Sequence, residues 1–62
     1  MKYFTIDVGS NLMVEMSREN FYDLLYSYSL SYADFHQHLA DLVYSKSNSI
    51  VVDGKVFIRE EE

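Results

Sequence analysis

Two histidines and two acids within one short stretch form the grouping in this chain that most resembles a metal site. His36 and His38 are the only side chains with an ordinary pKa near neutral pH. His38 has Asp34 four residues before it and Asp41 three residues after it, so the three share a face if the stretch is helical. They could then hold a divalent ion weakly. We favour a solvated His38 whose charged form is stabilised by the two carboxylates. His36 cannot join it as a second ligand, because residues two apart on a helix diverge by about 200°.

Other catalytic groupings are weaker still. The carboxylates of Glu19 and Asp23 could serve as a general acid and base, but a convex helix surface in a chain of 62 residues leaves little room for a pocket. The serines lie outside any nucleophile elbow, and most flank predicted helix ends or turns. With Gly9 and Gly54 as the only glycines, no phosphate-binding loop can be built. We therefore expect no enzyme activity, no cofactor and no bound metal.

Tyrosines and acids instead fall on the predicted outer faces of two helices. The chain has six tyrosines and no tryptophan, and tyrosine is enriched at protein interfaces because it combines a large rigid ring with a polar tip. The alternative is that these rings lie flat against neighbouring elements. The residues predicted to bind a protein partner are Glu19, Tyr22, Asp23, Tyr26, Asp34, Asp41 and Tyr44.

The charge of the chain bears on the class of partner. Ten acids against five bases give a net charge of −5, and the bases are isolated, so direct binding of nucleic acid is excluded as the main activity. A basic protein partner is favoured instead. Carboxylates four residues apart on a helix lie about 6 Å from each other, which is comparable with phosphate spacing. The chain could therefore occupy the basic groove of a nucleic-acid-handling protein as a DNA mimic.

Small size, acidity and the lack of a catalytic site resemble the broad type of phage-encoded anti-CRISPR and anti-restriction inhibitors. The resemblance is one of size and charge, and it implies an inhibitor or regulator. The alternative from another class is a structural or assembly protein that forms a homodimer through its C-terminal hairpin.

The first 16 residues predict a β-hairpin. In residues 2–8 apolar Phe4, Ile6 and Val8 alternate with Tyr3, Thr5 and Asp7, a period typical of strands. A turn at residues 9–11 is followed by a second strand over 12–16. We place Tyr3 on the outer face of the first strand.

Two helices should follow. Ser17 is a suitable N-cap, and Phe21, Leu24, Leu25 and Tyr28 have the spacing of one apolar stripe. Residues 26–32 alternate as a strand would, but Ser31 and Asp34 form a variant of the capping box. We therefore expect the first helix to end near Tyr28, a short link through Leu30, and a second helix from Tyr32 to about Ser45. The predicted inner stripe of the second helix is Tyr32, Phe35, Leu39, Leu42 and Val43.

The C-terminal segment predicts a second hairpin with a two-residue type I′ turn at Asp53-Gly54. Its register pairs Val52 with Lys55, Val51 with Val56, and Ile50 with Phe57. Both faces of this hairpin are then apolar, so the face away from the helices needs a cover, unless a slip or bulge changes the alternation. A second protomer or a target protein could supply that cover. The residues predicted for a dimer interface are Ile50, Val52 and Phe57.

These elements predict a two-layer α+β domain over residues 1–59, with a four-stranded, mainly antiparallel sheet against two helices, and an acidic tail over residues 60–62. Apolar residues make up 48% of the chain, and there is no cysteine. No apolar run approaches the roughly 20 residues of a membrane helix, and no signal peptide is expected. The cytoplasm is therefore the expected compartment.

Overall fold

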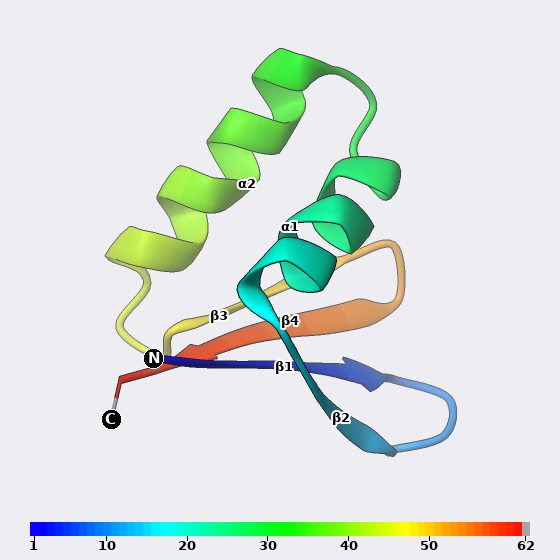
Figure 1. Ribbon diagram of the computed structural model, residues 1–62. Coiled ribbons are helices and arrows are strands. Elements are labelled where there is room, and N and C mark those ends of the chain that lie inside the picture. Colours follow the sequence, from blue (N-terminus) through cyan, green and yellow to red (C-terminus); the bar gives the residue numbers. More distant parts are fainter. Residues whose placement is uncertain (62) are drawn as a thin grey trace.

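Two β-hairpins flank a pair of helices along the chain, and they join into a single sheet in the computed structural model, which describes residues 1–61 (Figure 1). The elements are β1 (Lys2–Asp7), β2 (Met13–Met16), α1 (Arg18–Ser27), α2 (Tyr32–Tyr44), β3 (Ser49–Val52) and β4 (Lys55–Glu60).

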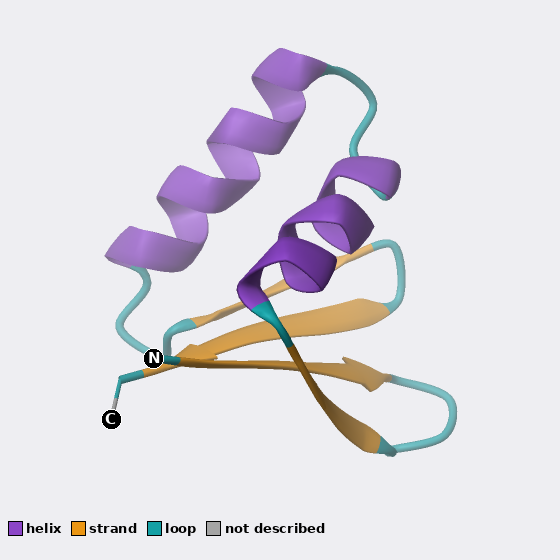
Figure 2. Ribbon diagram, in the orientation of Figure 1, coloured by secondary structure: helices purple, strands orange, loops and turns teal. Residues whose placement is uncertain are grey.

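The sheet has the strand order β2-β1-β4-β3, and all neighbouring strands are antiparallel. The central pair joins the first and last strands of the chain, from Lys2 opposite Glu60 to Asp7 opposite Lys55. Both helices lie against the same face of the sheet (Figure 2). The predicted two-layer α+β fold is therefore confirmed.

The second hairpin has the predicted turn and register. Asp53 and Gly54 both have positive φ angles, 48° and 77°, as a type I′ turn requires. Ile50, Val51 and Val52 lie opposite Phe57, Val56 and Lys55. Strand β4 continues through Glu60, so the predicted tail over 60–62 begins too early; Glu62 lies outside the described residues.

Serine side chains begin both helices. The Oγ of Ser17 accepts a hydrogen bond from the Asn20 amide at 3.2 Å, and the Oγ of Ser31 accepts one from the Asp34 amide at 3.1 Å. Helix α1 ends at Ser27. The segment 26–32 therefore contains no strand: it is the end of α1, a short connection, and the start of α2. The N-caps satisfy amide groups that have no partner within the helix.

The core lies between the two layers and is largely aromatic. Phe21 of α1 and Phe57 of β4 are fully buried, with ring centroids 5.5 Å apart in an edge-to-face arrangement. Leu25 and Leu42 supply the largest buried aliphatic side chains from the helices. Helix α2 contributes Phe35, Leu39 and Leu42 to this core, whereas Tyr32 and Val43, predicted in the same stripe, are exposed.

The prediction for Tyr3 is wrong, because its ring lies beneath α1. The Tyr3 and Phe21 centroids are 4.9 Å apart, and Tyr3 is buried. Burial and the neighbouring phenol of Tyr22 raise the pKa of Tyr3 above its ordinary value, although Arg18 and Arg59 act in the opposite direction.

The faces of the C-terminal hairpin are also assigned differently from the prediction. Phe57 is 0% exposed and Val52 is 8% exposed, and Ile50 packs against the same core. The prediction that these three form a dimer interface is therefore wrong, because α1 and α2 of the same chain cover them. The face away from the helices is the alternate set, which includes Phe4, Ile6, Val51, Val56 and Ile58.

A candidate protein-binding surface

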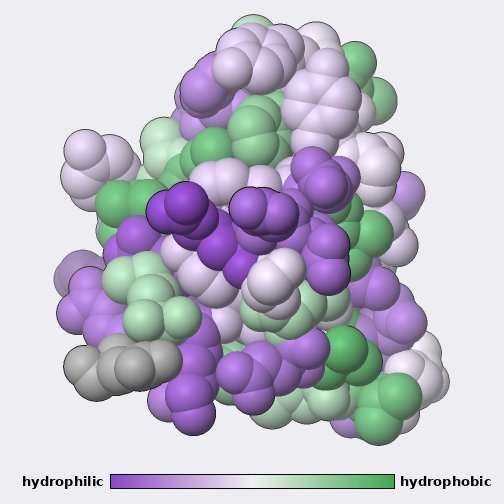
Figure 3. Space-filling model, viewed as in Figure 1, coloured by the Kyte–Doolittle hydropathy of each residue, from purple (hydrophilic) through white to green (hydrophobic). Residues whose placement is uncertain are grey.

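The exposed side of α1 carries a row of acids followed by a tyrosine. Glu19, Asp23 and Tyr26 are spaced i, i+4 and i+7, and all three are exposed. Within residues 1–61, none of the ion pairs involves Glu19 or Asp23. Figure 3 shows a band of strongly hydrophilic residues across the middle of this view, over the start of α1. These two carboxylates are therefore available to an approaching cation.

Tyr22 does not belong to that exposed row. Its ring is half-buried between the helices, with its centroid 6.1 Å from that of Tyr3 and 6.3 Å from that of Phe35. The short connection folds α2 back alongside α1 (Figure 1), so the flank of α1 that carries Tyr22 faces a neighbour rather than water. The expectation of an outward Tyr22 is wrong, and the alternative of a ring packed against neighbouring elements is correct for this residue.

An exposed aromatic cluster lies where α1 passes into α2. The centroid of Tyr26 is 5.3 Å from that of Phe35 and 6.2 Å from that of Tyr32, and Tyr32 is 4.4 Å from His36. Tyr26 and Tyr32 remain 50% and 63% exposed. We call the exposed set of Tyr26, Leu30, Tyr32 and His36 the aromatic corner.

Sequence reasoning missed three of the four residues in the aromatic corner. Tyr32 has the spacing of a core residue. It is, however, the first residue of α2, next to the connection from α1, and its ring is exposed there. Leu30 lies in the connection and is almost fully exposed. The available signal was the loop position of Leu30, which predicts exposure, together with its place between Tyr26 and Tyr32 in the sequence. Apolar residues that gather in an exposed loop can mark a binding patch.

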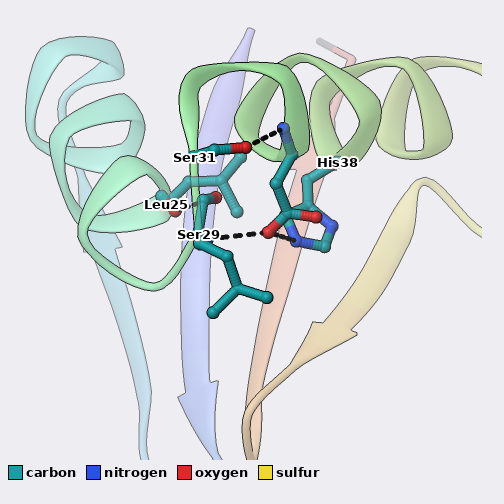
Figure 4. Close-up of polar contacts among 6 residues, drawn as sticks. Leu25, Ser29, Ser31 and His38 are labelled. Carbon is teal, nitrogen blue, oxygen red and sulfur yellow. Dashed lines mark hydrogen bonds and ion pairs between the residues drawn. The ribbon is translucent and has the colours of Figure 1, made fainter.

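Asp34 has a structural role that its predicted docking role did not include. Its Oδ2 accepts a hydrogen bond from the Leu30 amide at 2.8 Å and lies 3.2 Å from Nε2 of His38. The contacts around this carboxylate, together with the hydrogen bond that the Ser29 hydroxyl donates to the Leu25 carbonyl at 2.8 Å, are drawn in Figure 4. The Asp34 carboxylate thus links the connection, through the Leu30 amide, to the first turn of α2.

Asp41 and Tyr44 are exposed but lie away from the aromatic corner. Asp41 accepts a hydrogen bond from Nε2 of Gln37 at 2.9 Å. Tyr44 is 85% exposed and is the last residue of α2, at the opposite end of this helix from the connection (Figure 1). The seven predicted partner-binding residues therefore do not form one surface. Glu19, Asp23 and Tyr26 do.

The three candidate metal ligands are not brought together. Asp34 and His38 are adjacent, whereas Asp41 is engaged by Gln37. In the described part of the chain, no group of three histidine, aspartate or glutamate side chains is placed to hold a metal ion. The contact between Asp34 and His38 needs no metal, because the two residues lie one turn apart at the start of α2.

Comparisons with known proteins add no identification: no family model matches the chain, and neither curated proteins nor solved structures give a significant match. No helix within residues 1–61 is both long enough and apolar enough to cross a membrane.

Proposed function

We propose that this chain is a small acidic interaction module that binds a basic protein through the exposed side of α1 and the aromatic corner. The observation that carries the proposal is the continuous row of Glu19, Asp23 and Tyr26, in which both carboxylates are exposed and lack an ion-pair partner within residues 1–61.

The two halves of this surface suit different stages of binding. Unpaired carboxylates on a chain with a net charge of −5 attract a basic partner over a distance of about one Debye length. Tyr26 and Tyr32 then offer rigid rings that bury a large area at low entropic cost. Acids next to exposed rings are therefore better suited to a protein partner than to a small ligand.

In the finer form of the proposal, the partner is a nucleic-acid-handling protein and the chain inhibits or regulates it by occupying its basic groove. The support is the spacing of Glu19 and Asp23, about 6 Å for residues one turn apart on a helix. A groove that binds successive phosphates would accept these carboxylates at similar positions. The partner's nucleic acid and this chain would then compete for one site.

Capture from a lysate of the source cell, followed by titration of the purified partner, tests both forms. Two exposed charges worth about 0.5–1 kcal/mol each predict that Glu19→Gln with Asp23→Asn weakens binding about five- to thirtyfold at low salt. Asp41→Asn is the matched control, since it removes one exposed charge from another part of the molecule. Affinity should fall as salt rises.

Two results would remove the proposal. Binding that is indifferent to salt and to the double substitution would exclude the acidic surface as the contact. A partner that binds the chain and duplex DNA at the same time would exclude competition for a basic groove and leave only the coarser form.

A second candidate is a homodimer through the open face of the sheet. That face carries Phe4, Ile6, Val51, Val56 and Ile58, and neither α1 nor α2 lies over it. Four strands about 5 Å apart and about 20 Å long present a footprint of roughly 400 Å², about half of what each partner buries in a standard interface. A dimer through this face alone should be weak. Sedimentation velocity over a wide concentration range tests it, and a strict monomer would remove it.

A further inference from the structure

A groove of about 810 Å³ runs between the edge strand β2 and helix α1. Val14 and Met16 of β2 and Leu24 of α1 form its apolar part, while Asn20, Asp23 and Ser27 of α1 supply polar side chains along it. The α1 residues are spaced i, i+3, i+4 and i+7, which is one straight flank of a helix. The groove is therefore bounded by a strand on one side and a helix flank on the other.

Strand β2 has an open outer edge. It pairs with β1 on one side, and no strand within residues 1–61 pairs with the other. Edge strands are usually protected by lysine, proline, a bulge or a covering element. β2 has no lysine, proline or bulge, because its sequence is Met-Val-Glu-Met and its register with β1 is continuous. Met13 and Val14 are 50% and 44% exposed, so both faces of β2 are open as well.

The groove lies where the side chains of an added strand would point. Val14 and Met16 point toward the helix side of the sheet, since Tyr3, opposite Met16, is buried beneath α1. A segment that pairs with the outer edge of β2 would direct alternate side chains to this same side. There they would meet the apolar part of the groove and the flank of α1. The remaining side chains would point to the open face, near Glu15.

The charges around the groove select the occupant. Asp23 and Glu15 both line the groove, and Glu15 belongs to the open-face side of β2, since it lies opposite Phe4. Glu19 is one turn before Asp23 on α1, with Arg18 as the nearby base. A second copy of the chain, which has a net charge of −5, would bring like charges together along this edge. A basic segment is favoured by the same charges.

Resting on the proposed function, we infer that β2 and the β2–α1 groove bind an extended segment of the basic partner as a fifth strand, with apolar side chains in the groove and basic side chains on the open face beside Glu15. Glu19 and Asp23 attract this basic segment at longer range. Main-chain hydrogen bonds to β2 hold the segment, and the alternation of apolar and basic residues is what the site recognises.

The test uses the full chain, labelled for NMR, and a short synthetic peptide in which valine and lysine alternate. Binding should shift the amide signals of Met13 to Met16 and of Leu24, and slow hydrogen exchange along β2. Val14→Lys places a charged side chain in the groove where the valines must pack, and it should weaken peptide binding about tenfold or more. Met13→Lys is the matched control: it adds the same charge to β2 on the open face, beside the peptide's lysines. Repulsion between exposed charges is weak, so this variant should weaken binding by no more than about threefold.

Each other outcome overturns the inference. Signal changes confined to Glu19, Asp23 and Tyr26 would mean that the acidic row binds the peptide without strand addition, and the proposed function would stand. Equal losses in the two lysine variants would show a charge effect alone. A concentration-dependent dimer that Val14→Lys abolishes would assign the edge to a second copy. If the peptide fails to bind, strand addition falls, while the Glu19 and Asp23 variants still decide the proposed function separately.

Discussion

Replacing Asp34 with alanine tests whether this residue is a helix-start residue rather than a docking acid. The substitution removes the hydrogen bond from the Leu30 amide and the contact with His38, and it removes a negative charge from the first turn of α2. The hydrogen bond to the Ser31 hydroxyl survives the substitution, because its donor is the main-chain N–H of residue 34.

The magnitude follows from these three losses. The hydrogen bond to an exposed connection should contribute about 1 kcal/mol, the partly exposed histidine contact about 0.5 kcal/mol, and the charge at the helix N-terminus about 0.5 kcal/mol. Alanine recovers about 0.5 kcal/mol through its higher helix propensity. We expect a net loss of about 1.5 kcal/mol, which lowers the Tm of a domain of this size by about 6–12 °C.

Thermal and urea unfolding followed by far-UV circular dichroism measure this loss. Asp41→Ala is the control, since Asp41 lies on the same helix, is also hydrogen-bonded, and is three residues from its C-terminal end. A negative charge there gains nothing from the helix dipole, so we expect a change within about 0.5 kcal/mol. Equal shifts for the two variants, or an unchanged Tm for Asp34→Ala, would refute the structural role of Asp34.

Two further predictions concern the hairpin turn and the buried phenol. Gly54→Ala should lower the free energy of unfolding by about 1 kcal/mol, because a φ of 77° is unfavourable for a residue with a side chain, although a Cβ there meets nothing within 4 Å. Gly9→Ala is the control: a Cβ at Gly9 is also unobstructed, and the change should be nearly neutral. Equal losses of stability in the two variants would contradict the φ argument. Because the folded-state pKa of Tyr3 is raised, its protonated phenol stabilises the fold below pH about 10, and this contribution is lost as the pH rises toward the folded-state pKa. Tyr3→Phe should flatten the fall in urea stability at alkaline pH, and an unchanged slope would argue against it.

Local signals in the sequence were sufficient for the elements and for one register. Ser17 and Ser31 cap their helices as predicted, and the Asp53-Gly54 turn sets the pairing of β3 with β4. Each of these depends on side chains within a few residues, so no tertiary information was needed.

The choice of sheet face could not be read from the sequence. Alternation separates Phe4 and Ile6 from Tyr3 and Thr5, but both sets are able to pack against a helix. The buried set is decided by β4, which places Phe57 opposite Thr5 and beneath Phe21 of α1. Once Phe57 is inside, Tyr3 must be inside and the assumed dimer residues are core residues.

The candidate surface depended on the packing of one helix against another. Helical spacing correctly grouped Glu19, Asp23 and Tyr26, but the position of α2 beside α1 moved Tyr22 inward and left Tyr32 exposed. A wheel drawn for each helix alone contains no information about its neighbour.

Pairing of β1 with β4 has a consequence for synthesis of the chain. The middle of the sheet requires both β1 and β4, which pair from Lys2 opposite Glu60 to Asp7 opposite Lys55, so the chain must leave the ribosome through residue 60 before the core can close. Until then β1, β2 and the apolar sides of both helices have no completed sheet to cover them. Such non-local closure is slow relative to local helix formation, and nascent chains should therefore expose aggregation-prone apolar surface until β4 has emerged.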